Sequence, residues 1–265
     1  MILSSDASVI YTRDGQIATI TLDREHRLNA FTDDQVRALD AALQKFDLDP
    51  EANVAILHGA GRAFSTGADV QQRQLRPREE LIAQGGPQAR GAVAGELFGQ
   101  AVNWKPVIAA VHGYVMGLAT GIMLDADLIV AESGTKMQIT EVPRGLGGAR
   151  YWGLMHFRGA GAFANELAMT GRFFTAEEAL AAGLINRVAE PGEHLAVARE
   201  LAEAVCKNPP LSVRSSVRVR RWQTRRMAEE VDMYTKNEKL YLSEDFQESA
   251  RAFAEKREPA PYKGR

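Results

Sequence analysis

The sequence predicts a mixed α/β protein in which strands pair in parallel and helices connect them. Two short runs, 53–58 (NVAILH) and 107–111 (VIAAV), are rich in β-forming apolar residues, as expected of strands buried on both faces. A segment with helical spacing of apolar residues precedes the first run and another follows the second. Strands that alternate with helices in this way pair in parallel through helical crossovers. From residue 149 onward helix-forming residues dominate, which predicts a helical C-terminal region.

The first elements are a hairpin and a helix. Residues 9–22 hold two β-rich runs around Asp14-Gly15, a dipeptide favoured in two-residue hairpin turns because both positions take a positive φ. Residues 32–35 (TDDQ) match a capping box, which predicts a helix start. Apolar residues then follow at helical spacing: Val36, Leu39, Leu43 and Phe46.

The run 107–124 is apolar and long enough to suggest a membrane span. Gly113, Gly117 and Gly121 interrupt it and Asp125 closes it. A buried strand, a glycine turn and a buried helix explain this pattern better, so we expect no membrane partner.

Two later stretches complete the chain. Residues 71–103 are first charged and then glycine-rich, without a clean period, and we expect a mobile or partly helical insert that lies over a site. A β-like run at 184–188 interrupts the C-terminal helical region.

Composition excludes several classes of function. The chain has 265 residues and a net charge of −2, which gives no general attraction for nucleic acid, and the basic run 214–226 fits a solvated helix face better. The single Cys206 and five unclustered histidines predict neither a disulfide nor a metal site. Residues 1–6 lack the basic and apolar parts of a signal peptide, so we expect a cytoplasmic protein with a small-molecule partner.

Two glycine-punctuated segments carry the functional argument. Residues 64–70 (FSTGADV) and 113–121 (GYVMGLATG) each follow a predicted strand and open a helix. Helix N-termini offer unpaired N–H donors and partial positive charge, which suits an oxyanion that develops during reaction. Two donors from two loops predict an oxyanion hole.

These segments, in this order, resemble the signature of the crotonase (enoyl-CoA hydratase/isomerase) superfamily. Further landmarks of the family follow in register: Leu28-Asn29-Ala30, Glu141 before Gly145, residues 169–171 (MTG), residues 183–188 (GLINRV) and residues 253–257 (FAEKR). The resemblance implies a crotonase-like ββα spiral core over 1–190 that binds acyl-CoA, and a C-terminal helical trimerisation region over 191–265. It also implies a homotrimer or a dimer of trimers.

The resemblance implies the site residues as well. The oxyanion donors would be the N–H groups of Ala68 and Leu118. The coenzyme A arm would be bound by Arg27, Leu28, Ala68, Asp69, Val70, Gln71, Leu118, Phe253 and Lys256. Coenzyme A would enter as part of the thioester substrate, with no tightly bound cofactor and no metal.

The sequence departs from the hydratase pattern at one of the two glutamates. By motif alignment the first falls on Gly121 and the second on Glu141, which is then the only glutamate available as acid or base. A single carboxylate suits double-bond migration better than hydration, and the family contains isomerases with this pattern. Hydration, hydrolysis and decarboxylation stay open.

The departures also define secondary hypotheses. Leu118 stands where the family usually has glycine, and Gly121 is expected to make room for a bulky acyl group. Both departures fit an alternative function, a catalytically degraded acyl-CoA-binding or assembly subunit. Retention of Glu141 argues against this alternative. Arg144 and Tyr151 line the acyl pocket or have structural roles, and His112 is favoured as structural. Dinucleotide-dependent oxidoreduction is disfavoured, because the sequence has no G-x-G-x-x-G motif after a predicted strand.

Overall fold

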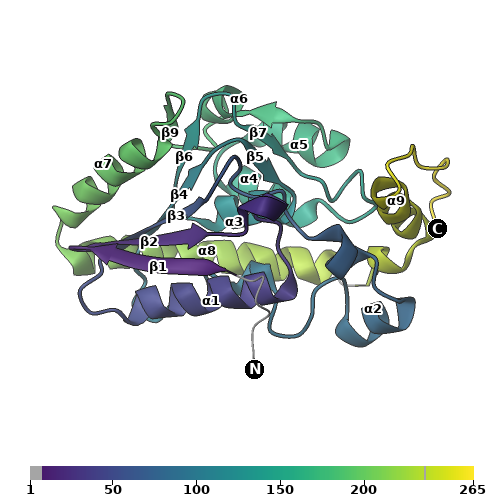
Figure 1. Cartoon of the computed structure of the whole chain (residues 1–265), viewed down its shortest axis with the longest axis horizontal. Helices are drawn as coiled ribbons and strands as arrows, with labels where there is room; N and C mark the ends of the chain where they lie inside the picture. The colour runs from purple at the N-terminus through teal and green to yellow at the C-terminus, as the bar shows by residue number, and fades with distance from the viewer. Residues whose placement is uncertain (1–7, 236) are drawn as a thin grey trace.

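The computed structural model describes residues 8–235 and 237–265 and places strands at the centre of a helical shell (Figure 1). Residues 1–6, on which the expectation about a signal peptide rests, lie outside the described residues. The strands are β1 (Val9–Asp14), β2 (Ile17–Leu22), β3 (Val54–Gly59), β4 (Val107–Val111), β5 (Tyr114–Met116), β6 (Leu128–Glu132), β7 (Lys136–Gln138), β8 (Phe174–Thr175) and β9 (Arg187–Ala189). The α-helices are α1 (Asp33–Leu48), α2 (Arg78–Gln84), α3 (Leu118–Asp125), α4 (Ala149–Phe157), α5 (Gly161–Thr170), α6 (Ala176–Ala181), α7 (His194–Cys206), α8 (Pro210–Thr235) and α9 (Glu244–Ala254). Short helical turns are η1 (Glu25–Arg27), the π-helical η2 (Val70–Gln74), η3 (Ala94–Glu96) and η4 (Leu240–Leu242).

The described strands form a larger sheet in the order β1-β2-β3-β4-β6-β9 and a smaller one in the order β5-β7-β8. In the larger sheet β1 and β2 pair antiparallel, and each following pair is parallel. Helical connections link the parallel strands, as Figure 1 shows. The predicted α/β class with parallel pairing is confirmed.

Apolar packing on both faces holds the larger sheet. The side chains of β3 and β4 are almost all buried. One set, including Ile56, Ile108 and Val130, packs with Ala198 and Ala202 of α7. The alternate set, including Leu57 and Ala109, joins the main core with α1 and α3. The lack of alternation in the sequence thus reflects a central sheet covered on both sides.

The hairpin is present, but its turn is one residue later than predicted. Asp14 pairs with Ile17, so the connecting residues are Gly15 and Gln16. Gly15 has φ +56° and Gln16 is not among the positive-φ residues. The expectation that Asp14 and Gly15 both take a positive φ is therefore wrong, since Asp14 continues the strand.

The helix predicted after residue 32 is α1, and half of its capping box is present. The Thr32 side chain accepts a hydrogen bond from the Gln35 N–H at 3.1 Å. The Gln35 side chain does not return to Thr32 but binds the backbone of Ser8 through both its oxygen (3.1 Å) and its nitrogen (2.9 Å). Gln35 thereby ties the segment before β1 to α1.

The apolar run 107–124 resolves into β4, the short strand β5 and α3, as the glycine pattern predicts, with β5 as an addition. In the described chain, no helix has the length and apolar character needed to cross a membrane.

The later stretches also take definite form. The insert 71–103 is partly helical, with η2, α2 and η3, as expected. The β-like run predicted at 184–188 is displaced, because β9 begins at Arg187 and the preceding residues form the turn after α6. In the basic run of α8, Arg220 and Arg221 turn inward and pair with Asp127, whereas other members are exposed.

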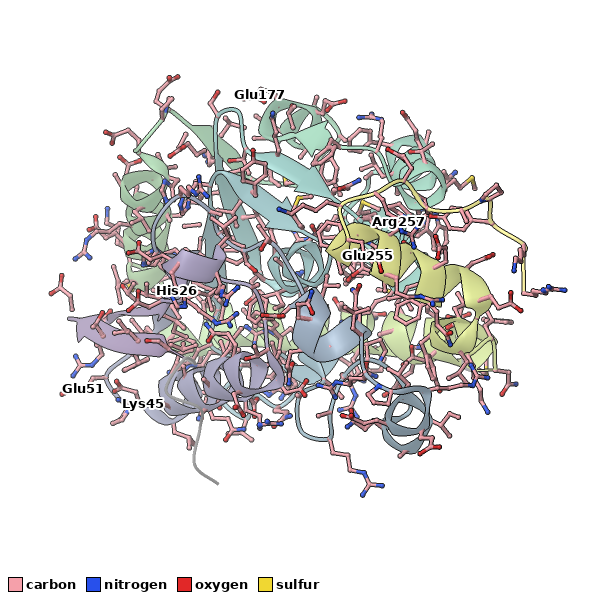
Figure 2. All side chains as sticks on the ribbon, turned by 45° about the vertical axis from the view of Figure 1, so that its right-hand side comes forward. His26, Lys45, Glu51, Glu177, Glu255 and Arg257 are labelled. Atoms are coloured by element: carbon pink, nitrogen blue, oxygen red, sulfur yellow. The ribbon has the colours of Figure 1, made fainter. Side chains whose placement is uncertain are left out.

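The C-terminal helix α9 lies beside the insert and carries its own ion pairs. Arg257, just past the helix end, donates to Glu248 and to Glu255, each at 2.6 Å, and Figure 2 shows Glu255 and Arg257 at this end of the chain. Contacts of α9 with η2 bring the end of the chain close to the 64–70 segment. Oligomerisation through residues 191–265 stays a prediction.

Candidate active site

The two glycine-punctuated segments lie side by side. The Ser65 N–H donates to the Tyr114 carbonyl at 3.1 Å, and the Met116 N–H donates to the Ser65 carbonyl at 3.1 Å. Asn29, which is fully buried, supports the first segment by donating from its side-chain amide to the carbonyls of Ala60 and Ala63, each at 2.9 Å. Segments distant in sequence are thereby held in parallel register.

A glycine allows their closest approach. Gly67 has φ +85°, and a Cβ on it would lie 2.3 Å from the Met116 carbonyl oxygen and 3.4 Å from the Leu118 nitrogen. No side chain fits this space, so only glycine lets the two loops meet. This contact places Leu118, the first residue of α3, next to Gly67, the residue before Ala68.

The candidate oxyanion donors come together here. Phe31 donates to the Gly67 carbonyl at 2.7 Å and accepts from the Asp69 N–H at 2.9 Å, a pattern that turns the Ala68 N–H away from Phe31. Leu118 is the first residue of α3, where N–H groups have no partner within the helix. Among the described residues, neither the Ala68 nor the Leu118 N–H donates a hydrogen bond.

The Glu141 carboxylate lies against the same point. A Cβ on Gly117 would lie 3.2 Å from Oε1 and 3.4 Å from Oε2 of Glu141, and 2.2 Å from the Thr140 hydroxyl. Gly117 therefore makes room for the loop that carries Glu141. The structure brings Glu141, Leu118 and the segment of Ala68 to one place.

Tyr151 of α4 is the hydrogen-bond partner of Glu141. Its hydroxyl donates to Oε1 at 2.5 Å, whereas Oε2 is enclosed and has no hydrogen-bond partner among the described residues. Burial raises the pKa of Glu141 to about 7, against the opposing effects of the Tyr151 hydrogen bond and the nearby Arg144 charge. The residue as a whole is partly exposed, so its carboxylate is the enclosed part. A carboxylate with a pKa near neutrality is suited to accept and return a proton.

Tyr151 also occupies the space beside Gly121. A Cβ on Gly121 would lie 3.2 Å from Cε1 of the Tyr151 ring and 3.6 Å from its hydroxyl oxygen. In the hydratase pattern Gly121 is the position of the first catalytic glutamate. Here the Tyr151 ring lies against Gly121 instead. That Gly121 makes room for a bulky acyl group stays a prediction; the structure shows its contact with Tyr151.

A cavity of about 650 Å³ opens on this side of the site. Leu118, Gly121 and Tyr151 line it, although Glu141 itself does not. Residues of the 71–103 insert and of α8 form much of the remaining wall. The insert therefore lies over the site, as the sequence predicts; its mobility stays a prediction.

Most of the expected coenzyme A residues cluster around Ala68. The Leu28 carbonyl accepts from the Thr66 N–H at 3.1 Å, and Arg27 is exposed beside it in η1. Asp69 caps η2 by accepting from the Gln72 N–H at 3.2 Å and pairs with Arg24 at 3.1 Å, consistent with a helix-start role. Val70 and the exposed Gln71 are the first residues of η2.

The two C-terminal candidates differ in placement. The exposed ring of Phe253 lies under the Arg144 guanidinium, whose central carbon is 3.5 Å from the ring centroid. This contact links α9 to the loop of Glu141. Lys256 lies exposed beyond the end of α9.

His112 has a structural environment. Its Nε2 lies 2.9 Å from the Gly61 carbonyl, and its ring stacks on His194 with centroids 4.5 Å apart. Within residues 8–235 and 237–265, no group of three or more metal-ligating side chains is placed to hold an ion.

Comparison with known proteins identifies the family of the chain. The sequence model of the enoyl-CoA hydratase/isomerase family matches residues 12–265. The chain belongs to this family. It is 36% identical over 272 residues to a carnitinyl-CoA dehydratase of Salmonella heidelberg, with 97% of this chain and 99% of the relative covered. It is 32% identical over 271 residues to an enoyl-CoA hydratase of Mycobacterium tuberculosis, with 97% of each covered.

A solved structure shares the fold as well. The carnitinyl-CoA hydratase of Mycobacterium avium superposes with a TM-score of 0.77 at 29% identity, covering 99% of this chain and 100% of that one. The predicted crotonase fold is confirmed, and the chain is an enzyme of the family acting on acyl-CoA.

Sequence reasoning left the pairing of Tyr151 open and missed Arg73. Tyr151 comes ten residues after Glu141, and only the fold of the intervening loop turns α4 back onto the carboxylate. Arg73 stands in a charged stretch that is typical of a solvated surface, yet it is 3% exposed. No pattern in the sequence indicates that Arg73 lies in the cavity wall.

Proposed function

We propose that the enzyme moves the double bond of an enoyl-CoA thioester, with Glu141 as its single acid and base. The observation that carries the proposal is the Glu141 carboxylate, held by Tyr151 beside the start of α3, with tyrosine rather than a second carboxylate next to Gly121.

The chemistry follows from these groups. With the thioester oxygen at the N–H groups of Ala68 and Leu118, ionised Glu141 removes a proton from the carbon next to the thioester. The electron pair moves onto the thioester oxygen as an enolate, which the two N–H groups stabilise. Glu141 then returns the proton two carbons further along, so the mass of the thioester is unchanged.

The coenzyme A arm is proposed to lie along Arg27, Leu28 and the turn 68–71, with Phe253 and Lys256 closing over it. The cations suit the anionic phosphates of coenzyme A through charge-assisted hydrogen bonds. In this proposal the chain assembles as a trimer or a pair of trimers.

Hydration is the second candidate, because two relatives are named as an enoyl-CoA hydratase and a carnitinyl-CoA dehydratase. Incubation with matched 2-enoyl-CoA and 3-enoyl-CoA thioesters, followed by mass spectrometry and chromatography, separates the two. Migration of the double bond at constant mass, absent in Glu141→Gln, supports isomerisation. A gain of one water as the main product supports hydration and contradicts the proposal.

A further inference from the structure

The feature that the proposed mechanism does not use is Arg73 of η2. Its side chain is buried, yet it lines the same cavity as Leu118 and Tyr151. Five arginines and three carboxylates line that cavity, and they differ in how they are paired.

The other arginines of the cavity wall have carboxylate partners at hydrogen-bond distance. Arg150 donates to Asp125 at 2.7 Å and Arg220 to Asp127 at 3.2 Å. Arg221 also donates to Asp127, and Arg225 donates to Glu229 at 3.0 Å. Each of these four arginines therefore has a hydrogen-bonded carboxylate partner, with Asp127 shared by Arg220 and Arg221.

The Arg73 guanidinium, unlike the other arginines of the cavity wall, has no hydrogen-bonded carboxylate partner in the described part of the chain. Its Nη2 donates to the Ala92 carbonyl at 3.2 Å, and its Nε lies 3.5 Å from Asp33 as an ion pair without hydrogen-bond geometry. Nε and Nη1 are enclosed and have no hydrogen-bond acceptor among the described residues. A buried donor that lacks an acceptor is destabilising, more so when the group is charged, and therefore calls for an explanation.

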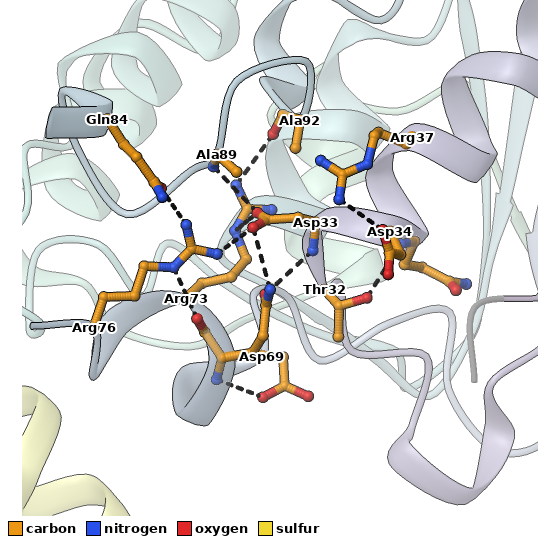
Figure 3. Close-up of polar contacts among 12 residues, drawn as sticks. Thr32, Asp33, Asp34, Arg37, Asp69, Arg73, Arg76, Gln84, Ala89 and Ala92 are labelled. Atoms are coloured by element: carbon orange, nitrogen blue, oxygen red, sulfur yellow. Dashed lines mark hydrogen bonds and ion pairs between the residues drawn. The ribbon is translucent and has the colours of Figure 1, made fainter. Parts of the chain in front are cut away.

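Asp33 pairs with Arg73 only through the 3.5 Å contact of its Oδ1, and other donors hold the Asp33 carboxylate in its present orientation. Oδ1 accepts from the Ala89 N–H at 3.2 Å, and Oδ2 accepts from Gln72 at 3.2 Å and from Arg76 (Figure 3). The Arg73 guanidinium thus retains free N–H groups and part of its charge next to the cavity.

We infer that Arg73 binds a carboxylate at the far end of the acyl group, so that the substrates are coenzyme A thioesters of dicarboxylic acids. An acyl chain whose thioester oxygen lies at the Leu118 N–H extends into the cavity that Arg73 lines. A carboxylate there offsets the buried charge, and it accepts from the free N–H groups once the guanidinium turns toward the cavity. An acyl group ending in a cation is disfavoured for the same reason. The position of the thioester is taken from the proposed function, and the inference rests on it in this respect.

Binding of saturated thioesters, which have no double bond to move, tests this independently of turnover. Isothermal titration calorimetry compares succinyl-, glutaryl- and adipyl-CoA with butyryl-, pentanoyl- and hexanoyl-CoA, which match them in carbon number. At the length that fits the cavity, the dicarboxylic thioester is expected to bind roughly 10- to 100-fold more tightly, the difference typical of a hydrogen bond to a charged group.

Variants assign the preference to Arg73. Arg73→Met should remove the preference while leaving affinity for the monocarboxylic thioester unchanged, which also shows that the variant is folded; Arg73→Lys should retain part of it. Arg225→Gln removes a charge from the same cavity at an exposed position and should keep the preference in full.

Equal affinity within every pair, an unchanged preference in Arg73→Met, or tighter binding of carnitinyl-CoA, whose acyl group ends in a cation, would each overturn the inference. If the pairs bind equally while 3-enoyl-CoA is isomerised, the inference fails and the proposed function stands. If the dicarboxylic preference holds and no double bond moves, the inference stands and the proposed reaction fails.

Discussion

Replacing Glu141 by glutamine should abolish turnover and make the protein relatively more stable as the pH rises. Burial raises the pKa of Glu141 from 4.5 to about 7, so the folded protein binds this proton more tightly than the unfolded chain does. The stability that comes from this proton is fully present below pH 4.5 and is lost as the pH rises through about 7. A shift of this size corresponds to about 3 kcal/mol of unfolding free energy at pH 8.

Glutamine removes this charge but introduces a different cost. Its carbonyl oxygen can accept the Tyr151 hydroxyl, which leaves its amide nitrogen in the enclosed position of Oε2 without an acceptor among the described residues. That loss is roughly 1–3 kcal/mol and does not depend on pH. The difference between the two proteins should therefore change with pH by about 2 kcal/mol between pH 5 and pH 8, in favour of the variant at pH 8.

Urea denaturation of both proteins at the two pH values, at one protein concentration, measures this change. Glu178→Gln, which makes the same substitution at the capping-box glutamate of α6 outside the site, is the matched control. If the stability difference between wild type and Glu141→Gln is the same at pH 5 and pH 8, Glu141 is not a buried carboxylate with a raised pKa, and the reasoning fails.

Three further predictions test the arrangement of the site. Tyr151→Phe removes the hydrogen bond that lowers the pKa of Glu141, so the acidic limb of the kcat/KM profile should move to higher pH, with roughly tenfold lower activity at pH 7. Gly67→Ala places a Cβ 2.3 Å from a backbone oxygen and should lower kcat by about 100-fold or more by separating the oxyanion donors. Gly134→Ala, also at a positive φ (+75°) but with nothing within 4 Å, should affect stability only, which unfolding and kinetic assays distinguish. Lys256→Gln should raise KM for acyl-CoA several-fold at unchanged kcat, and the effect should vanish for pantetheine thioesters, which lack the nucleotide phosphates.

A specific result would contradict each of these three predictions. An unshifted pH profile in Tyr151→Phe would mean that the hydroxyl does not set the ionisation of Glu141. Equal kinetic losses in Gly67→Ala and Gly134→Ala would trace the effect to backbone strain rather than loop separation. A KM change that is equally large for pantetheine thioesters would place Lys256 away from the phosphates.

Much of the fold was predictable because local and tertiary preferences agree. The buried runs that become β3 and β4 are almost entirely apolar, and Gly113 and Gly117, which follow β4 and β5, lie where neighbouring loops touch. Local chemistry misled where a tertiary partner intervened. Gln35 leaves its capping box to bind Ser8, and the backbone pairs with β6 as the strand β9 only from Arg187 onward.

The candidate site was predictable in part for the same reason. Glycine spacing located the two segments that meet, and the family resemblance named Ala68 and Leu118 within them, whose role as donors stays a prediction. Side-chain environments were not, because they depend on which elements pack together. The contact of Tyr151 with Gly121 and Glu141 requires α4 to fold back on α3, and burial of Arg73 requires the insert to close over η2.

The most direct test of the central claim is hydrogen exchange at the carbon next to the thioester. Incubating the enzyme with butyryl-CoA in deuterium oxide and measuring the thioester mass requires only the oxyanion hole and a base. The account predicts that the wild-type enzyme adds deuterium at this carbon and that Glu141→Gln does not. Equal exchange by both proteins, or none by the wild type, would contradict an enolate formed by Glu141.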